Sequence, residues 1–353
     1  MDEINEKFLE KLVSIPRATG YEFKAQQEVK KYLECCVDDL YGDRIGNLYS
    51  VINPDRSFKI MIAGHIDQIG FQITHIDKDG FLWFLPLGKF DYTTLPGKRV
   101  ILTGENGSTI GLIGKKSINL MKPEEKKKVP TLEELFIDIG CKTKEDAEKK
   151  ANIGDFAVFN YGYQRLGEHN FAVAAGFDDS IGAFIVAEVM KELSKDKDFY
   201  AGVYGVTTVQ EEVGIRGATV AAHNINPDVG IIFDVGHTTD NSNISKKQRG
   251  DLKLGEGPIL TIGPDVNPKL LNRIIKIAEE NNIPYQKQAW PIETGTDTSA
   301  IMLSGAATAL ISIPNRYMHT PSEVISLNDV ANIIKLVVLV IRSITEEDLF
   351  ILL

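Results

Sequence analysis

The sequence predicts an α/β fold, in which a doubly wound and mostly parallel sheet carries an inserted β-barrel domain. Short runs of β-branched residues alternate with helical patterns over most of the chain. Between residues 71 and 165 the pattern changes to short alternating segments broken by glycine. The length of 353 residues is typical of two domains, or of one large domain with an insertion.

Four apolar runs predict the buried strands of the sheet. They are residues 59–63, 201–209, 229–233 and 308–313. Apolar runs that end in polar or glycine-rich residues are typical of parallel strands covered on both faces. Helical spacing over residues 181–193 and 268–281 predicts two of the covering helices.

The middle of the chain predicts a separate β domain. Residues 80–87, 98–103 and 108–113 read as short strands, and residues 144–151 as one helix. This pattern indicates a small barrel or sandwich. We therefore expect an α/β domain built from residues 1–70 and 166–353, with residues 71–165 inserted into it.

Composition and charge exclude several classes of protein. The net charge of −10 would repel a phosphate backbone, so nucleic acid is not an expected partner. The longest apolar stretch, residues 336–341, is far shorter than the roughly 20 residues of a membrane helix, so no membrane is expected either. The first twelve residues lack the pattern of a secretory signal, and three cysteines form no full disulfide set. We expect a cytoplasmic protein.

Residues of metal-ligand type follow the predicted strands. His65 and Asp67 follow the first run, Glu211 and Glu212 the second, Asp234 the third and His319 the fourth, while Asp178 and Asp179 open the helix near Ile181. In an open parallel sheet, ligands bind beyond the carboxyl ends of the strands. Each residue alone is more often an ordinary polar residue, but their joint occurrence favours one functional site.

Histidine nitrogen and carboxylate oxygen are donors for zinc, cobalt or manganese. The predicted ligands of two divalent ions are His65, Asp178, Glu212, Asp234 and His319. Each ion would receive one histidine, one terminal carboxylate and a shared aspartate. Glu211 would be free to act on water, and Asp67 is placed to orient His65. A weaker signal, the loop with Gly295 and Thr296, is interpreted as part of a substrate pocket.

Several motifs resemble the TET-type aminopeptidases, metallopeptidase family forty-two, some relatives of which are labelled endoglucanases. The motifs are Gly64-His65-Ile66-Asp67, Leu135-Phe136-Ile137-Asp138-Ile139-Gly140, Asp178-Asp179, Gln210-Glu211-Glu212-Val213-Gly214, Arg216-Gly217-Ala218, Gly295-Thr296-Asp297 and Arg316-Tyr317-Met318-His319-Thr320-Pro321. The resemblance implies a zinc-exopeptidase-like domain interrupted by a dimerisation domain, and assembly into dimers or tetrahedral dodecamers. It implies the same five metal ligands with Asp178 bridging, Glu211 as general base, and short peptides as substrates.

Two positions depart from that pattern. Gln68 stands where the family usually has glutamate, and Ser180 where it usually has arginine. These departures leave open a non-catalytic metal-binding assembly protein. The endoglucanase-labelled relatives and the many carboxylates leave open a metal-independent glycoside hydrolase. The preferred N-terminal residue and the native metal are also left open by the sequence.

Overall fold

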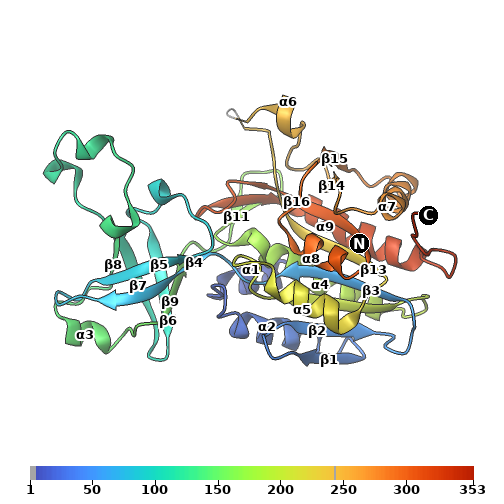
Figure 1. The fold of residues 1–353 in the computed structure, drawn as a ribbon, viewed down its shortest axis with the longest axis horizontal. Helices are drawn as coiled ribbons and strands as arrows, with labels where there is room; N and C mark the ends of the chain where they lie inside the picture. Colours follow the sequence, from blue (N-terminus) through green and yellow to red (C-terminus); the bar gives the residue numbers. More distant parts are fainter. Residues whose placement is uncertain (1–4, 242–243) are drawn as a thin grey trace.

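The computed structural model describes residues 5–241 and 244–353, and Figure 1 shows a β barrel beside a larger α/β domain. Each part has its own hydrophobic core. The core of the larger part includes Ile62 and Phe184, and that of the barrel includes Phe71 and Ile137. The predicted fold class is confirmed.

The larger domain is built on one mixed sheet, with eleven strands among the described residues. In order, its strands are β1 (Asp39–Gly42), β2 (Leu48–Ile52), β12 (Gly202–Thr208), β3 (Lys59–His65), β13 (Val229–His237), β16 (Ala307–Arg316), β17 (Glu323–Ser326), β11 (Phe171–Ala174) and β10 (Gln164–Leu166), with β14 (Ile259–Ile262) paired to β16 and to β15 (Gln286–Ala289). The four predicted strands are β3, β12, β13 and β16, which form its parallel centre. The other pairs on this path are antiparallel.

Helices cover both faces of this sheet. They are α1 (Glu6–Ser14), α2 (Phe23–Leu33), α4 (Phe177–Ser194), α5 (Arg216–Ile225), α7 (Pro268–Glu280), α8 (Asp297–Leu303) and α9 (Leu327–Ser343). The short α6 (Lys246–Arg249) lies on a loop that projects from this domain (Figure 1). A Cβ at Gly64 of β3 would lie 2.5 Å from the backbone of Gly182 in α4. Gly230 of β13 faces the opposite side, where a Cβ would lie 2.7 Å from Ile301 of α8. The sheet is therefore doubly wound, as predicted.

The inserted part is a closed antiparallel barrel. Around it run β4 (Gly70–Ile76), β5 (Leu82–Leu87), β8 (Phe136–Asp138), β7 (Gly107–Gly114), β6 (Arg99–Gly104) and β9 (Phe156–Phe159). The loops carry α3 (Lys144–Glu148) and the 3₁₀ turns η1 (Tyr92–Thr94), η2 (Ile118–Leu120), η3 (Glu125–Lys127) and η4 (Leu132–Glu134). Its first and last strands pair at Phe71 and Ala157, so the chain enters and leaves the barrel at one place. The predicted short strands correspond to β5, β6 and β7.

The four parallel strands point their carboxyl ends toward the same edge of the sheet. Side chains that follow them therefore meet there, even when they are far apart in the sequence. In the described part of the chain, no helix is long and apolar enough to cross a membrane.

Candidate metal centre

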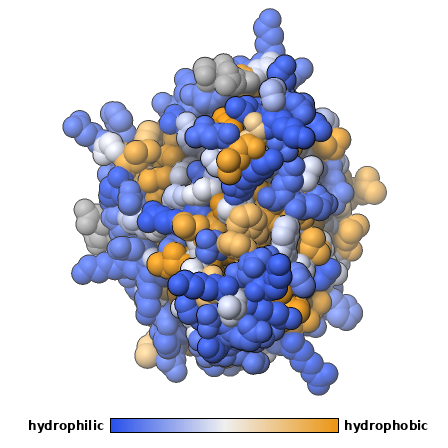
Figure 2. Space-filling view, turned by 90° about the vertical axis from the view of Figure 1, so that its left-hand side faces the viewer, coloured by the Kyte–Doolittle hydropathy of each residue, from blue (hydrophilic) through white to orange (hydrophobic). Residues whose placement is uncertain are grey.

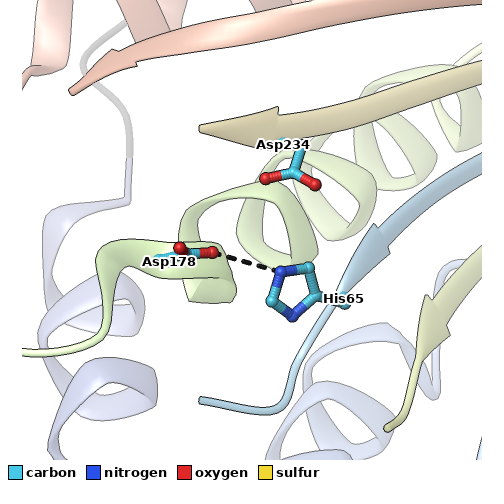
Figure 3. A group of neighbouring side chains, drawn as sticks. All are labelled: His65, Asp178 and Asp234. Atoms are coloured by element: carbon cyan, nitrogen blue, oxygen red, sulfur yellow. Dashed lines mark ion pairs between the residues drawn. The ribbon is translucent and has the colours of Figure 1, made fainter. Parts of the chain in front are cut away.

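Three of the predicted ligands, His65, Asp178 and Asp234, lie together beside β3, β13 and the start of α4 (Figure 3). His65 is the last residue of β3. We predicted Asp234 at a strand end, but β13 continues to His237 because it stays paired with β16. The pairing of β13 with β3 stops at Ile232, so Asp234 is open toward His65.

Asp178 lies between two histidines. Its Oδ1 is 3.2 Å from Nε2 of His65, and its Oδ2 is 3.0 Å from Nε2 of His319. The backbone of Asp178 is not helical, with φ −72° and ψ 107°, although it lies within the bounds of α4. Because its two oxygens face different histidines, Asp178 has the geometry of a shared ligand.

Among the described residues, two groups of three side chains could each hold a metal ion, and within each group the donor atoms lie within 4.8 Å of one another. The buried group consists of His65, Asp178 and Asp234, and the open group of Asp178, Glu212 and His319. Glu212 also has a buried Oε1 without a hydrogen-bond partner. A buried carboxylate oxygen needs a donor or a cation, so these residues fit divalent metal ions.

Electrostatics supports this fit. Burial raises the pKa of Asp234 and that of Glu212 to about 8. Burial also opposes ionisation of Asp178, but hydrogen bonds from His319 and His65 outweigh it and hold the pKa of Asp178 well below its usual range. The centre thus gathers buried carboxyl groups with too little positive charge around them to neutralise them all. Divalent cations would supply that charge.

Asp67 contacts both His65 and the turn that carries Glu211 and Glu212. Its carboxylate accepts hydrogen bonds from the backbone amides of Glu211, at 3.1 Å, and Glu212, at 3.2 Å. Its Oδ1 also lies 3.4 Å from Nδ1 of His65. The same Nδ1 lies 3.1 Å from the backbone carbonyl oxygen of Asp67. Asp67 therefore contacts the histidine and also holds the turn that carries both glutamates.

Glu211 belongs to neither group of donors but lies beside the buried one. Its Oε2 is 3.9 Å from Nε2 of His65. Burial, together with the neighbouring carboxylate of Asp234, raises the pKa of Glu211 to about 10. A buried carboxylate in this place can hold a proton close to the reacting groups.

Sequence reasoning missed Glu323 and gave no role to Asp179. Glu323 accepts hydrogen bonds from the backbone amides of Asp178 and His319, at 2.8 and 3.0 Å. Asp179 accepts one from the amide of His65 at 3.2 Å. Glu323 begins the buried strand β17, and an acidic residue at the start of an apolar run was the available signal.

A cavity of about 530 Å³ opens beside the ligands. Gly295 and Thr296 line it, as interpreted from the sequence, together with His237. Lys89, on a loop of the barrel, also lines it and was not foreseen. The pocket is therefore formed by both domains.

Imidazole and carboxylate donors around a cavity, at the strand ends of a doubly wound sheet, define a metal-dependent hydrolase. A family model described as M42 glutamyl aminopeptidase matches residues 46–336, and the chain belongs to that family. The protein is thus a peptide-bond hydrolase, a metal-dependent aminopeptidase that uses divalent ions.

Individual relatives agree in sequence and fold. The chain is 34% identical to a lysyl aminopeptidase of Pyrococcus furiosus over 94% of both chains. The structure of a TET aminopeptidase from the archaeon Thaumarchaeota archaeon SCGC AB-539-E09 matches with a TM-score of 0.93 and 30% identity, covering 98% of this chain and 97% of the other. The Pyrococcus horikoshii TET1 peptidase, which can assemble into a tetrahedron or a large octahedral shell, matches with a TM-score of 0.86 and 30% identity over 96% and 99%.

Proposed function

We propose that this chain is a two-metal aminopeptidase that removes N-terminal residues from short peptides, with Glu211 as the general base. The observation that carries the proposal is the position of Asp178, whose two oxygens face His65 and His319 separately. A carboxylate in that position can serve two ions at once. Zinc, cobalt and manganese all suit the donors.

In this proposal Asp178 is the shared ligand, His65 and Asp234 complete one set, and Glu212 and His319 the other. Bound ions would acidify a water molecule and stabilise negative charge on the peptide carbonyl oxygen. Neighbouring cations favour the ionised form of a carboxyl group, so Glu211 would be ionised in the metal-loaded enzyme. There it accepts the proton of the attacking water and passes it to the leaving amine. Asp67 keeps His65 in place during this transfer.

The test of this division of roles is a comparison of Glu211→Gln with Glu212→Gln. Glu211→Gln should keep two ions per chain but lower turnover of aminoacyl anilides by about 10² to 10⁴-fold, because an amide cannot take a proton at neutral pH. Glu212→Gln should instead weaken metal binding. Metal content and turnover are measured on the same samples. An empty centre in Glu211→Gln, or near-normal turnover with both ions bound, would contradict the proposal.

Family membership does not favour either of the two alternative functions. A glycoside hydrolase of the usual kind uses two facing carboxylates and no metal. Cellulose hydrolysis by the exhaustively chelated protein would support that alternative and contradict ours. Absence of any metal-dependent anilide turnover would support the non-catalytic alternative.

We also propose that the chain forms a homo-oligomer through its barrel, as the sequence resemblance implied. Figure 2 shows hydrophobic side chains among hydrophilic ones on the face that the barrel presents. Large exposed side chains on the barrel include Ile110, Ile118 and Leu120, at 61%, 64% and 72% exposure. Apolar side chains exposed to this degree favour burial against another subunit.

The barrel surface can be tested by light scattering at micromolar concentration. Wild-type protein should have a mass above that of a monomer, and Ile118→Glu with Leu120→Glu should lower it, because burying two carboxylates in an interface is costly. Leu303→Glu, on the exposed surface of α8, is the matched control. A monomeric wild-type mass, or dissociation only by the control, would contradict the barrel interface.

A further inference from the structure

Arg17 is the one lysine or arginine with a buried side chain among residues 5–241 and 244–353. It lies on a short segment that pairs with the backbone next to Asp67. The amide of Gln68 donates to the carbonyl of Arg17 at 3.1 Å, and the amide of Thr19 donates to the carbonyl of Gln68 at 3.1 Å. The segment also reaches the centre directly, because Oγ1 of Thr19 donates to Asp67 at 2.8 Å.

The guanidinium of Arg17 joins two distant parts of the chain. Its Nη1 donates to the carbonyl oxygens of Val13 and Ile15, at 3.2 and 3.1 Å, at the end of α1. Its Nη2 donates to the carbonyl oxygen of Gly176. Gly176 lies two residues before Asp178, so this hydrogen bond acts on the segment that presents the shared ligand.

The surroundings of Gly176 leave little freedom. Its φ of +72° is a left-handed conformation, and a Cβ there would lie 1.9 Å from Oε1 of Gln68 and 2.9 Å from Nη2 of Arg17. The Oγ of Ser180 donates to the same Gly176 carbonyl at 2.6 Å. Gln68 and Ser180, the two departures noted in the sequence, therefore both lie around the group that Arg17 binds.

Arg17 is also close to the acidic groups of the centre. Burial lowers the pKa of Arg17 to about 10, because it outweighs the opposing effect of the carboxylates of Glu323, Asp67 and Asp179. Arg17 is therefore charged at neutral pH. A buried charge of this kind is retained only where hydrogen bonds and opposite charges compensate it.

We propose that Arg17 is a positioning residue of the metal centre, which fixes the Gly176 carbonyl and thereby sets the position of Asp178 toward both groups of donors. This proposal rests on the proposed two-metal function. Because Asp178 is shared, a loss of Arg17 should weaken both ions together. A purely electrostatic role predicts the opposite, since removal of one cation favours binding of others nearby.

The experiment measures binding of zinc and cobalt to the purified full-length protein by competition with a chelator. Arg17→Met should bind both ions about 10 to 100-fold more weakly than wild type, the size typical of losing a group that supports metal ligands. Arg17→Lys keeps the charge but lacks the planar fork that donates in two directions, so it should also bind both ions more weakly. The absorption spectrum of bound cobalt should change in both variants, because the ligand geometry changes.

Arg273→Met is the matched control. Arg273 of α7 donates to the carbonyl oxygen of Ser343 at 2.9 Å and to Asp348, far from the centre in the fold. Its loss should lower stability without changing metal affinity. Circular dichroism and mass measurement of each metal-free variant show that the compared proteins are folded and assembled alike.

Several results would overturn the role of Arg17. They are unchanged or tighter metal binding in Arg17→Met, a loss confined to one ion, wild-type binding in Arg17→Lys, or an equal loss in Arg273→Met. Wild-type protein is measured first in the same assay. If it binds fewer than two ions, the proposed function fails as well, whereas two tightly bound ions in both wild type and Arg17→Met contradict the role of Arg17 alone.

Discussion

The two groups of metal donors differ in how the fold holds them. His65 and Asp234 of the buried group lie on the parallel strands β3 and β13, and the His65 side chain is 2% exposed. Glu212 and His319 of the open group lie on turns, and the His319 side chain is 29% exposed. The candidate centre thus combines one group held mainly on buried strands with one held mainly on turns.

The turn of His319 shows how the open group is held. The φ of His319 is +61° and that of Tyr317 is +64°, a conformation that non-glycine residues adopt at a cost. The hydrogen bond from the His319 amide to Glu323 compensates for this cost. Ligands on such a turn can move with less disturbance of the core than ligands on a central strand.

The largest effect is expected where the two groups meet. Asp178→Ala should leave only two donors in each group, so both ions should be lost and turnover should fall to background. Metal analysis after dialysis and anilide assays measure the two effects. Retention of one tightly bound ion would show that the groups are independent and that Asp178 is not shared.

A smaller effect should separate the groups. His319→Ala should remove one ion per chain and leave the other, because the buried group is intact. In wild-type protein, chelator-induced metal release should have a fast and a slow phase, and His319→Ala should lack the fast phase. Release in a single phase from wild type, or loss of the slow phase in the variant, would reverse our ranking of the two groups.

The smallest effect concerns pH. Burial raises the pKa of Asp234 and the pKa of Glu212 to about 8. Burial alone would lower the pKa of His319, but the hydrogen bond to Asp178 outweighs burial, and the pKa of His319 is raised to about 9. The folded metal-free protein therefore holds more protons than the unfolded chain, and its stability should fall as pH rises from about 6 to 9. Bound cations replace those protons, so the loaded protein should change less.

Denaturant unfolding of chelated and metal-loaded samples across this range measures the difference. A metal-free protein whose stability is constant or rises with pH would show that these groups do not hold extra protons. The control is the loaded protein at each pH, since its other titrating groups are the same.

The strand-end rule explains which parts of the centre could be predicted from the sequence. It found His65, Glu212 and His319 because each lies at or after the carboxyl end of a parallel strand. The rule placed Asp234 after the end of a strand, whereas Asp234 lies within β13. The end of β13 depends on its pairing with β16, and pairing is not visible in a single sequence. The division at residues 70 and 165 remains a prediction, although the barrel strands run from Gly70 to Phe159.

The supporting residues could not be found by the same rule. Glu323 begins a strand that pairs antiparallel with β16, so its amino end, not its carboxyl end, faces the centre. Arg17 precedes β1 in the chain and reaches the centre through backbone pairing with Gln68 and through its hydrogen bond to the Gly176 carbonyl. Contacts between residues so distant in the chain have no local signature in sequence.

The adjacent ends of the barrel have a consequence for protein engineering. Because Phe71 and Ala157 are paired neighbours, the barrel can be deleted as one continuous segment, and a short turn can join the two remaining parts of the chain. Lys89, which lines the cavity, would leave with the barrel, and so would Gly88, where a Cβ would lie 3.4 Å from Glu212. The trimmed chain would keep all five proposed ligands, but its cavity would lack the wall that the barrel contributes.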